Sequence, residues 1–106
     1  MKIINCTPHP IRFRASDGTI TEFPYTGYVP RVSVDYTETT VDGILFSLPV
    51  HGDVVGLPEQ EDGTYLIVSR MVASASGRSD LIVPCKFDRD ESGNILHCRS
   101  FEVMKI

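Results

Sequence analysis

Two short segments of this sequence carry residues whose types and spacing suit the binding of a small anion. His9 stands between two prolines, just after Thr7, so its backbone is held extended and its imidazole is presented from a stiff segment. Ser69 and Arg70 follow an apolar stretch and open a predicted helix, where free backbone N–H groups and a guanidinium together attract an anion. The sequence therefore indicates a ligand-binding role for all four residues.

Structural roles fit the same residues. His9 is also suited to hydrogen-bond a neighbouring carbonyl, and Ser69 is also suited to cap the helix. Arg78, in a polar turn before an apolar strand, and Arg99, which shares a strand face with His97, are further candidates for a polar pocket. The candidate ligand-binding set is thus Thr7, His9, Ser69, Arg70, Arg78 and Arg99. In addition, Arg12 and Arg14 share a strand face, placed to pair with Glu22 or a ligand phosphate.

Neither catalysis nor metal binding has a signature in the sequence. There is no G-x-S-x-G elbow, H-E-x-x-H pair, phosphate loop or G-x-G-x-x-G segment. A zinc site built from Cys6, His9, Cys85, His97 and Cys98 is disfavoured, because adjacent residues on a strand point to opposite faces. The acidic runs lack the ligand spacing of a calcium loop. We therefore predict no catalytic residue, metal or cofactor, and three cysteines that form no disulfide within the chain.

Length and charge limit the classes of protein and partner. The chain has 106 residues, 42% of them hydrophobic, which predicts a single domain over residues 1–106 with a thin core. A net charge of -4 disfavours binding to duplex nucleic acid, which needs clustered Lys and Arg. Since neither a signal peptide nor a membrane-spanning stretch is evident, we expect a cytoplasmic protein without a membrane partner.

Closely spaced glycines and prolines break the sequence into short segments typical of β-strands. Alternating patterns predict one hairpin from residues 11–14 and 20–23, and a second from 32–36 and 44–50. Pro49 removes a backbone donor, which places its segment at a sheet edge or the end of that segment at a bulge. The apolar surface around residues 44–50 would be covered by pairing between copies, so we expect a homo-oligomer.

The centre of the chain has a different pattern. Continuous apolar runs at 65–68 and 81–83 predict interior strands, and residues 69–76 between them predict a short helix, with Ser69 at its start and Gly77 beyond its end. A parallel crossover and a helix capping a small barrel both fit this connection. With a last strand at 95–103, the predicted fold class is mainly β (α+β): a small partly open barrel or twisted mixed sheet with one short helix near residues 69–76.

Several blocks of the sequence resemble a family of small uncharacterised proteins found in bacteriophages and bacterial genomes. These are N-C-T-P-H-P at 5–10, Y-L-I-V-S-R-M-V-A at 65–73, D-L-I-V-P at 80–84 and C-R-S at 98–100. The resemblance implies a phage or mobile-element origin. Together with the candidate anion site, it predicts an accessory protein, with an anti-defence role in the host cytoplasm, that binds a small anionic, nucleotide-like ligand or a host protein. A structural or protein-interaction module of a phage particle and a small nucleotide-acting hydrolase are the alternatives.

Overall fold

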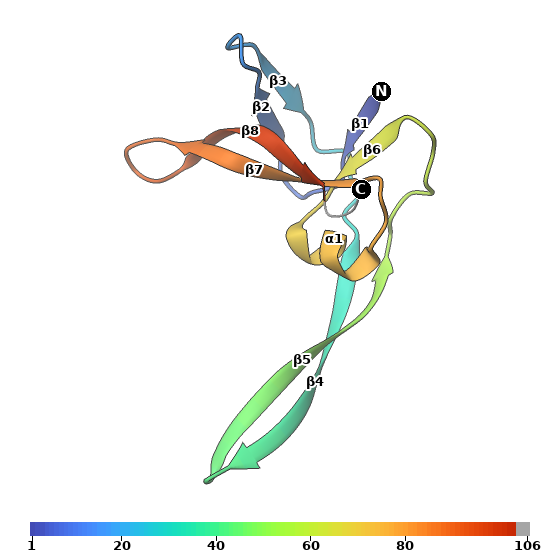
Figure 1. Ribbon diagram of the computed structural model, residues 1–106, viewed down its shortest axis with the longest axis vertical. Helices are drawn as coiled ribbons and strands as arrows, with labels where there is room; N and C mark the ends of the chain where they lie inside the picture. The colour runs from blue at the N-terminus through green and yellow to red at the C-terminus, as the bar shows by residue number, and fades with distance from the viewer. Residues whose placement is uncertain (104–106) are drawn as a thin grey trace.

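The computed structural model describes residues 1–103 and is built mainly of β-strands. The predicted single domain covers residues 1–106, so its last three positions lie outside the described residues. Six strands form one mixed sheet: β1 (Lys2–Asn5), β2 (Ile11–Arg14), β3 (Ile20–Phe23), β6 (Thr64–Ile67), β7 (Leu81–Arg89) and β8 (Ile95–Val103). Their order across the sheet is β1-β6-β7-β8-β2-β3 (Figure 1).

The six-stranded sheet curves into a nearly closed barrel. Its two edge strands, β1 and β3, approach one another, and a side chain at the end of β1 donates a hydrogen bond to the last residue of β3. Within residues 1–103 this sheet is accompanied by one short helix, α1 (Arg70–Ser76). The predicted fold class, a mainly-β domain with a barrel-like mixed sheet and a short helix near residues 69–76, is confirmed.

The core lies where the apolar runs predicted interior strands. β6 and β7 sit inside the sheet and pair in parallel, with Leu66 opposite Leu81, so α1 is the crossover between two parallel neighbours. Leu66, Val68 and Leu81 are almost fully buried and pack with Val72 of α1. The parallel crossover, one of the two arrangements that fitted the sequence, is therefore the one adopted.

Both ends of α1 follow the sequence prediction. The Ser69 side chain accepts a hydrogen bond from the backbone N–H of Val72 at 3.3 Å. At the other end Gly77 adopts the left-handed conformation, with φ of 68°, and its N–H donates to the carbonyl of Ala73. These two caps limit the helix to seven residues.

The remaining strands form a separate two-stranded sheet, which we call the arm (residues 31–55). It consists of β4 (Arg31–Val41) and β5 (Ile44–Val55), joined by Asp42 and Gly43. Both turn residues have positive φ, 51° and 76°, as a two-residue hairpin turn requires. Figure 1 shows the arm projecting away from the six-stranded sheet, with α1 beside its base. The predicted hairpin is confirmed, as is the edge position of Pro49, because each strand of a two-stranded sheet is an edge.

Among residues 1–103, no helix has both the length and the apolar character needed to cross a membrane.

Candidate functional site

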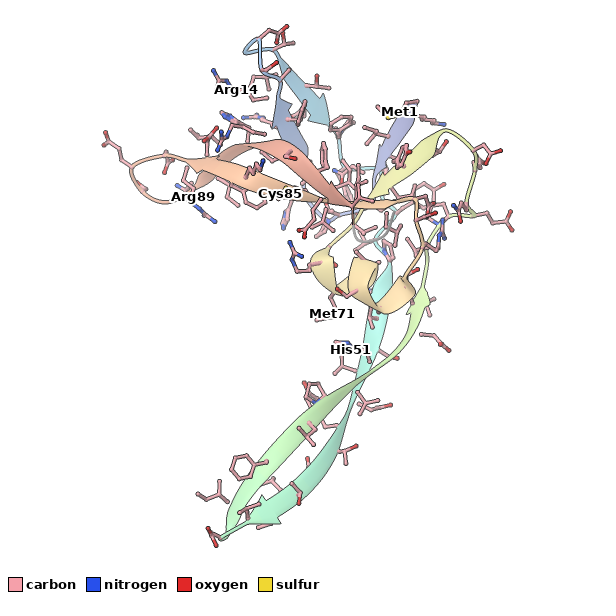
Figure 2. All side chains as sticks on the ribbon, viewed as in Figure 1. Met1, Arg14, His51, Met71, Cys85 and Arg89 are labelled. Carbon is pink, nitrogen blue, oxygen red and sulfur yellow. The ribbon has the colours of Figure 1, made fainter. Side chains whose placement is uncertain are left out.

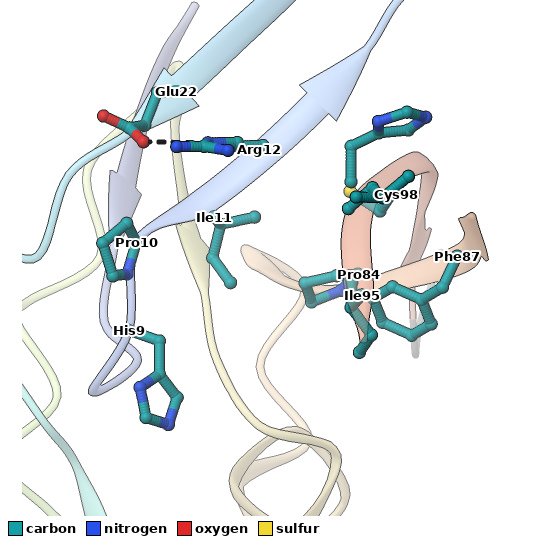
Figure 3. Close-up of a pocket in the computed structure, with 11 residues that line it drawn as sticks. His9, Pro10, Ile11, Arg12, Glu22, Pro84, Phe87, Ile95 and Cys98 are labelled. Carbon is teal, nitrogen blue, oxygen red and sulfur yellow. Dashed lines mark hydrogen bonds and ion pairs between the residues drawn. The ribbon is translucent and has the colours of Figure 1, made fainter. Parts of the chain in front are cut away.

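A groove of about 500 Å³ lies between β2 and the β7–β8 hairpin, and we call it the β2–β8 groove. β2 and β8 run parallel and pair at Phe13 and Cys98. Residues preceding that pair on both strands line the groove, so the groove is the space where the two strands diverge (Figure 3). Its lining residues are His9, Pro10, Ile11, Arg12, Glu22, Pro84, Phe87, Ile95, Leu96, His97 and Cys98.

The loop that carries His9 is held by the buried side chain of Asn5. The Asn5 amide nitrogen donates to the carbonyls of His9, at 2.7 Å, and Phe23, at 3.0 Å. Its amide oxygen accepts from the backbone N–H of Thr7 at 3.0 Å. The carbonyl of Asn5 in turn accepts from the Thr26 hydroxyl at 2.6 Å. Asn5 therefore joins the ends of β1 and β3 and fixes the backbone from which His9 projects.

Thr7 belongs to this same buried network. Its hydroxyl lies 2.7 Å from the amide oxygen of Asn5 and 2.9 Å from the carbonyl of His9, and donates its one proton to either. Because Thr7 is buried, its contacts stabilise the loop and do not face the groove. The resemblance had drawn attention to this N-x-T-P-H segment, but the sequence did not single out Asn5 as the residue that holds it together.

On the opposite wall of the groove, His97 is paired with a carboxylate. Asp88 and His97 lie directly opposite each other on β7 and β8, and the His97 Nε2 is 2.7 Å from the Asp88 Oδ2. Arg99 Nε approaches the same oxygen at 3.3 Å. Since a carboxylate oxygen only accepts, Nε2–H of His97 donates to it and the ring orientation is fixed. Arg99, a predicted pocket residue, thus lies next to the groove and contacts the carboxylate that orients His97.

Arg12 and Phe87 add a cation and an aromatic ring to the groove. Arg12 forms an ion pair with Glu22, its direct neighbour across β2 and β3, with Nε to Oε1 at 3.1 Å (Figure 3). The two side chains are 61% and 50% exposed, and pairs this exposed contribute about 0–1 kcal/mol. Phe87 is 41% exposed. The groove therefore combines an accessible aromatic face with a weakly held guanidinium.

The other predicted residues lie elsewhere. Ser69 caps α1, and the neighbouring Arg70 forms an ion pair with Glu102. Arg78 donates two hydrogen bonds to the carboxylate of Asp80, at 3.0 and 2.6 Å, and a third to the carbonyl of Pro58 at 2.9 Å. It lines a separate cavity formed by residues of β5 and α1 and the loops that follow them. Figure 2 shows α1, which carries Met71, beside the base of the arm. Of the six predicted residues, the structure thus places His9 in the β2–β8 groove and Arg99 beside it.

Burial makes two of the three cysteines harder to ionise. All three are free, as predicted. Burial raises the pKa of Cys98, which lines the groove, and also the pKa of Cys6, where the charge of Arg78 partly offsets the effect. Because a thiolate is the nucleophilic form, neither is activated for catalysis. The part of the chain described by the structure, residues 1–103, holds no group of three or more potential metal ligands.

Comparison of this chain with protein-family models, with curated proteins and with solved structures finds no match.

Proposed function

We propose that this protein binds a small anionic, nucleotide-like ligand in the β2–β8 groove, as an accessory protein of a phage or mobile element. The observation that carries the proposal is the presence, on one groove, of the exposed ring of Phe87, the guanidinium of Arg12 and the imidazole of His9. An aromatic face suits a planar base, and these donors suit a phosphate.

The ion pair of Arg12 does not prevent this role. Its partner Glu22 is half exposed, so the pair stabilises the fold little and its two members separate at small cost. A phosphate offers a guanidinium two parallel, charge-assisted hydrogen bonds, which are stronger than the single exposed contact. Arg12 therefore exchanges a weak intramolecular partner for a stronger ligand partner.

The groove is a better place for this ligand than the start of α1. The Arg70–Glu102 pair at the helix start is about as exposed as the Arg12–Glu22 pair, so the two guanidiniums are equally available to a ligand. The exposed ring of Phe87 favours the groove, and the Ser69 hydroxyl at the helix start is already engaged by the N–H of Val72. The groove also borders the fixed loop of His9, so little ordering is needed on binding. Under this proposal the protein acts by sequestering its ligand, which agrees with the anti-defence role that the phage resemblance implies.

Calorimetry against panels of nucleotides and cyclic nucleotides tests the proposal. Arg12→Gln should weaken binding about 10-fold or more, the loss of one charge-assisted hydrogen bond. Arg14→Gln is the matched control, because Arg14 lies on the same strand and face but does not line the groove. A Phe87→Ala variant should also weaken binding of nucleotides more than binding of inorganic phosphate, since only the base stacks on the ring.

Three results would overturn the proposal. If no member of the panels binds, the interaction-module alternative is favoured. If Arg70→Gln abolishes binding while Arg12→Gln does not, the ligand lies at the start of α1 instead. If product analysis shows that the ligand is converted, the protein is the hydrolase of the other alternative.

A further inference from the structure

The arm exposes a continuous apolar row along one of its faces. Directly paired residues of β4 and β5 share a face, and the register places Thr37 with Leu48 and Thr39 with Phe46. From Ile44 to Val50, every β5 residue on that face is apolar. These side chains are between 49% and 60% exposed. We call this set the outer row: Val41, Ile44, Phe46, Leu48 and Val50.

A β-bulge turns the outer row away from the core. At the base of the arm Val32 pairs with Val54, and both pack against the core. The next recorded pair is Val34 with His51, so two residues of β5 oppose one of β4 and the alternation on β5 is reversed. Without the bulge, the outer row would continue on the core-facing side of Val54. The bulge therefore directs the row to the opposite face.

Surface of this kind needs permanent cover. A two-stranded hairpin is marginally stable in water unless a further element packs on it. The outer row exposes on the order of 500 Å² of apolar side chain, as large as the whole of a typical monomer's largest patch. The radius of gyration is 16.8 Å, against about 13 Å for a compact chain of this length, because the arm stands away from the body.

We propose that the outer row packs against the outer row of a second copy of this chain, in an antiparallel two-fold dimer. A partner that covers the outer row in every folded chain must be as abundant as the chain itself. A second copy of the chain meets this condition. Two such rows bury about 1,000 Å² in total, which reaches the smallest area expected of a biological interface. The face that carries the outer row has no Lys, Arg or Glu at positions 35–41 of β4 or 44–50 of β5.

Charge selects the antiparallel arrangement. Asp35, opposite Val50 near the base of the arm, is the charged residue among the pairs that carry the outer row. Packing two arms side by side in the same direction would bring the two Asp35 carboxylates together, which costs free energy. In the antiparallel arrangement the tip of each arm lies at the base of the other, and the two carboxylates are at opposite ends.

Two leucines of β5 provide a matched test. Leu48 belongs to the outer row, whereas Leu45, paired with Thr40, lies on the other face, and both are 59% exposed. Light scattering over micromolar to millimolar concentrations should give a dimer for the full chain. Leu48→Asp should raise the dissociation constant about 100-fold or more, because a two-fold interface contains the substitution twice, and Leu45→Asp should leave it within about threefold.

Three further variants guard against misfolding and test the orientation. Leu48→Thr introduces a β-branched residue of high strand propensity and should also weaken the dimer, with an unchanged far-ultraviolet circular dichroism spectrum. Under mild oxidation Thr39→Cys, in the middle of the row, should yield a disulfide-linked dimer, whereas Asp42→Cys, at the tip, should not. A monomeric full chain, equal effects of the two leucine substitutions, or ready linkage through the tip would each overturn the proposal.

Discussion

Removing the side chain of Asn5 should be among the most destabilising single changes in this protein. Asn5 is 1% exposed, and its side chain satisfies the carbonyls of His9 and Phe23 and the N–H of Thr7. In Asn5→Ala the carbonyl of Phe23 and the N–H of Thr7 lose this partner, and the carbonyl of His9 keeps only the Thr7 hydroxyl. Each such loss costs about 1–3 kcal/mol, so we expect a total of about 4 kcal/mol after partial relaxation. That is a large share of the roughly 5–15 kcal/mol that stabilises a typical domain.

Urea denaturation at equilibrium measures this change. Asn94→Ala is the control, because Asn94 is exposed and its side chain makes one long contact with Asp90, so its loss should stay within about 0.5 kcal/mol. The melting temperature of Asn5→Ala should fall by roughly 15 °C or more. If the free energies of unfolding of the two variants differ by less than about 1 kcal/mol, Asn5 does not close the barrel and our account of the loop is wrong.

The nearly isosteric change Asn5→Asp separates hydrogen bonding from packing. It replaces the amide nitrogen by an oxygen that faces the carbonyls of His9 and Phe23. Burial and these two oxygens should raise the pKa of the new carboxyl in the folded state above its unfolded value. The loss of stability should therefore be smallest below about pH 4 and should grow as the pH rises through that value. A deficit that is independent of pH would refute this reasoning.

Three further predictions concern the cysteines and the bulge. Since burial raises the pKa of Cys6 and Cys98, both should be alkylated by iodoacetamide far more slowly than the partly exposed Cys85, a difference that peptide mass spectrometry would detect; equal rates would contradict their burial. The same raised pKa values mean that the unfolded state loses these protons first, so the free energy of unfolding should fall as the pH rises from about 8 to 10. A β-carbon at Gly52 would lie 2.2 Å from the Ser33 hydroxyl oxygen, so Gly52→Ala should cost about 1 kcal/mol in thermal denaturation. Adding Ser33→Ala should recover most of that cost, and additive losses in the double variant would show that the two residues do not meet.

The sequence predicted the candidate site only in part. His9 was found because its two flanking prolines are a local signal, and it does line the groove. Arg12 and Arg14 were predicted to pair with Glu22 or with a ligand phosphate, and the structure contains the pair between Arg12 and Glu22. Phe87 was not singled out, because nothing near it in the chain distinguishes an exposed groove residue from a strand residue facing the core.

Local pattern determined the elements of this protein. The signals that predicted them each involve only a few neighbouring residues. They are the Asp-Gly and Gly-rich turns, the alternation of apolar residues, the continuous apolar runs of β6 and β7, and the caps of α1. They fixed the hairpins, the interior strands, the short helix and therefore the fold class. Such signals are read from sequence because turn geometry and helix capping are decided by neighbouring residues.

Tertiary structure decided which elements meet. Side-chain alternation has a period of two along every strand, so it marks a strand without naming its neighbour. It left open that β2 would lie beside β8 and open a groove there, and that Asn5 would reach across to β3. It also left open the bulge that places Leu48 on the opposite face of the arm from Val54. Those choices depend on contacts between residues far apart in the chain, whose free energy is gained only once the barrel has closed.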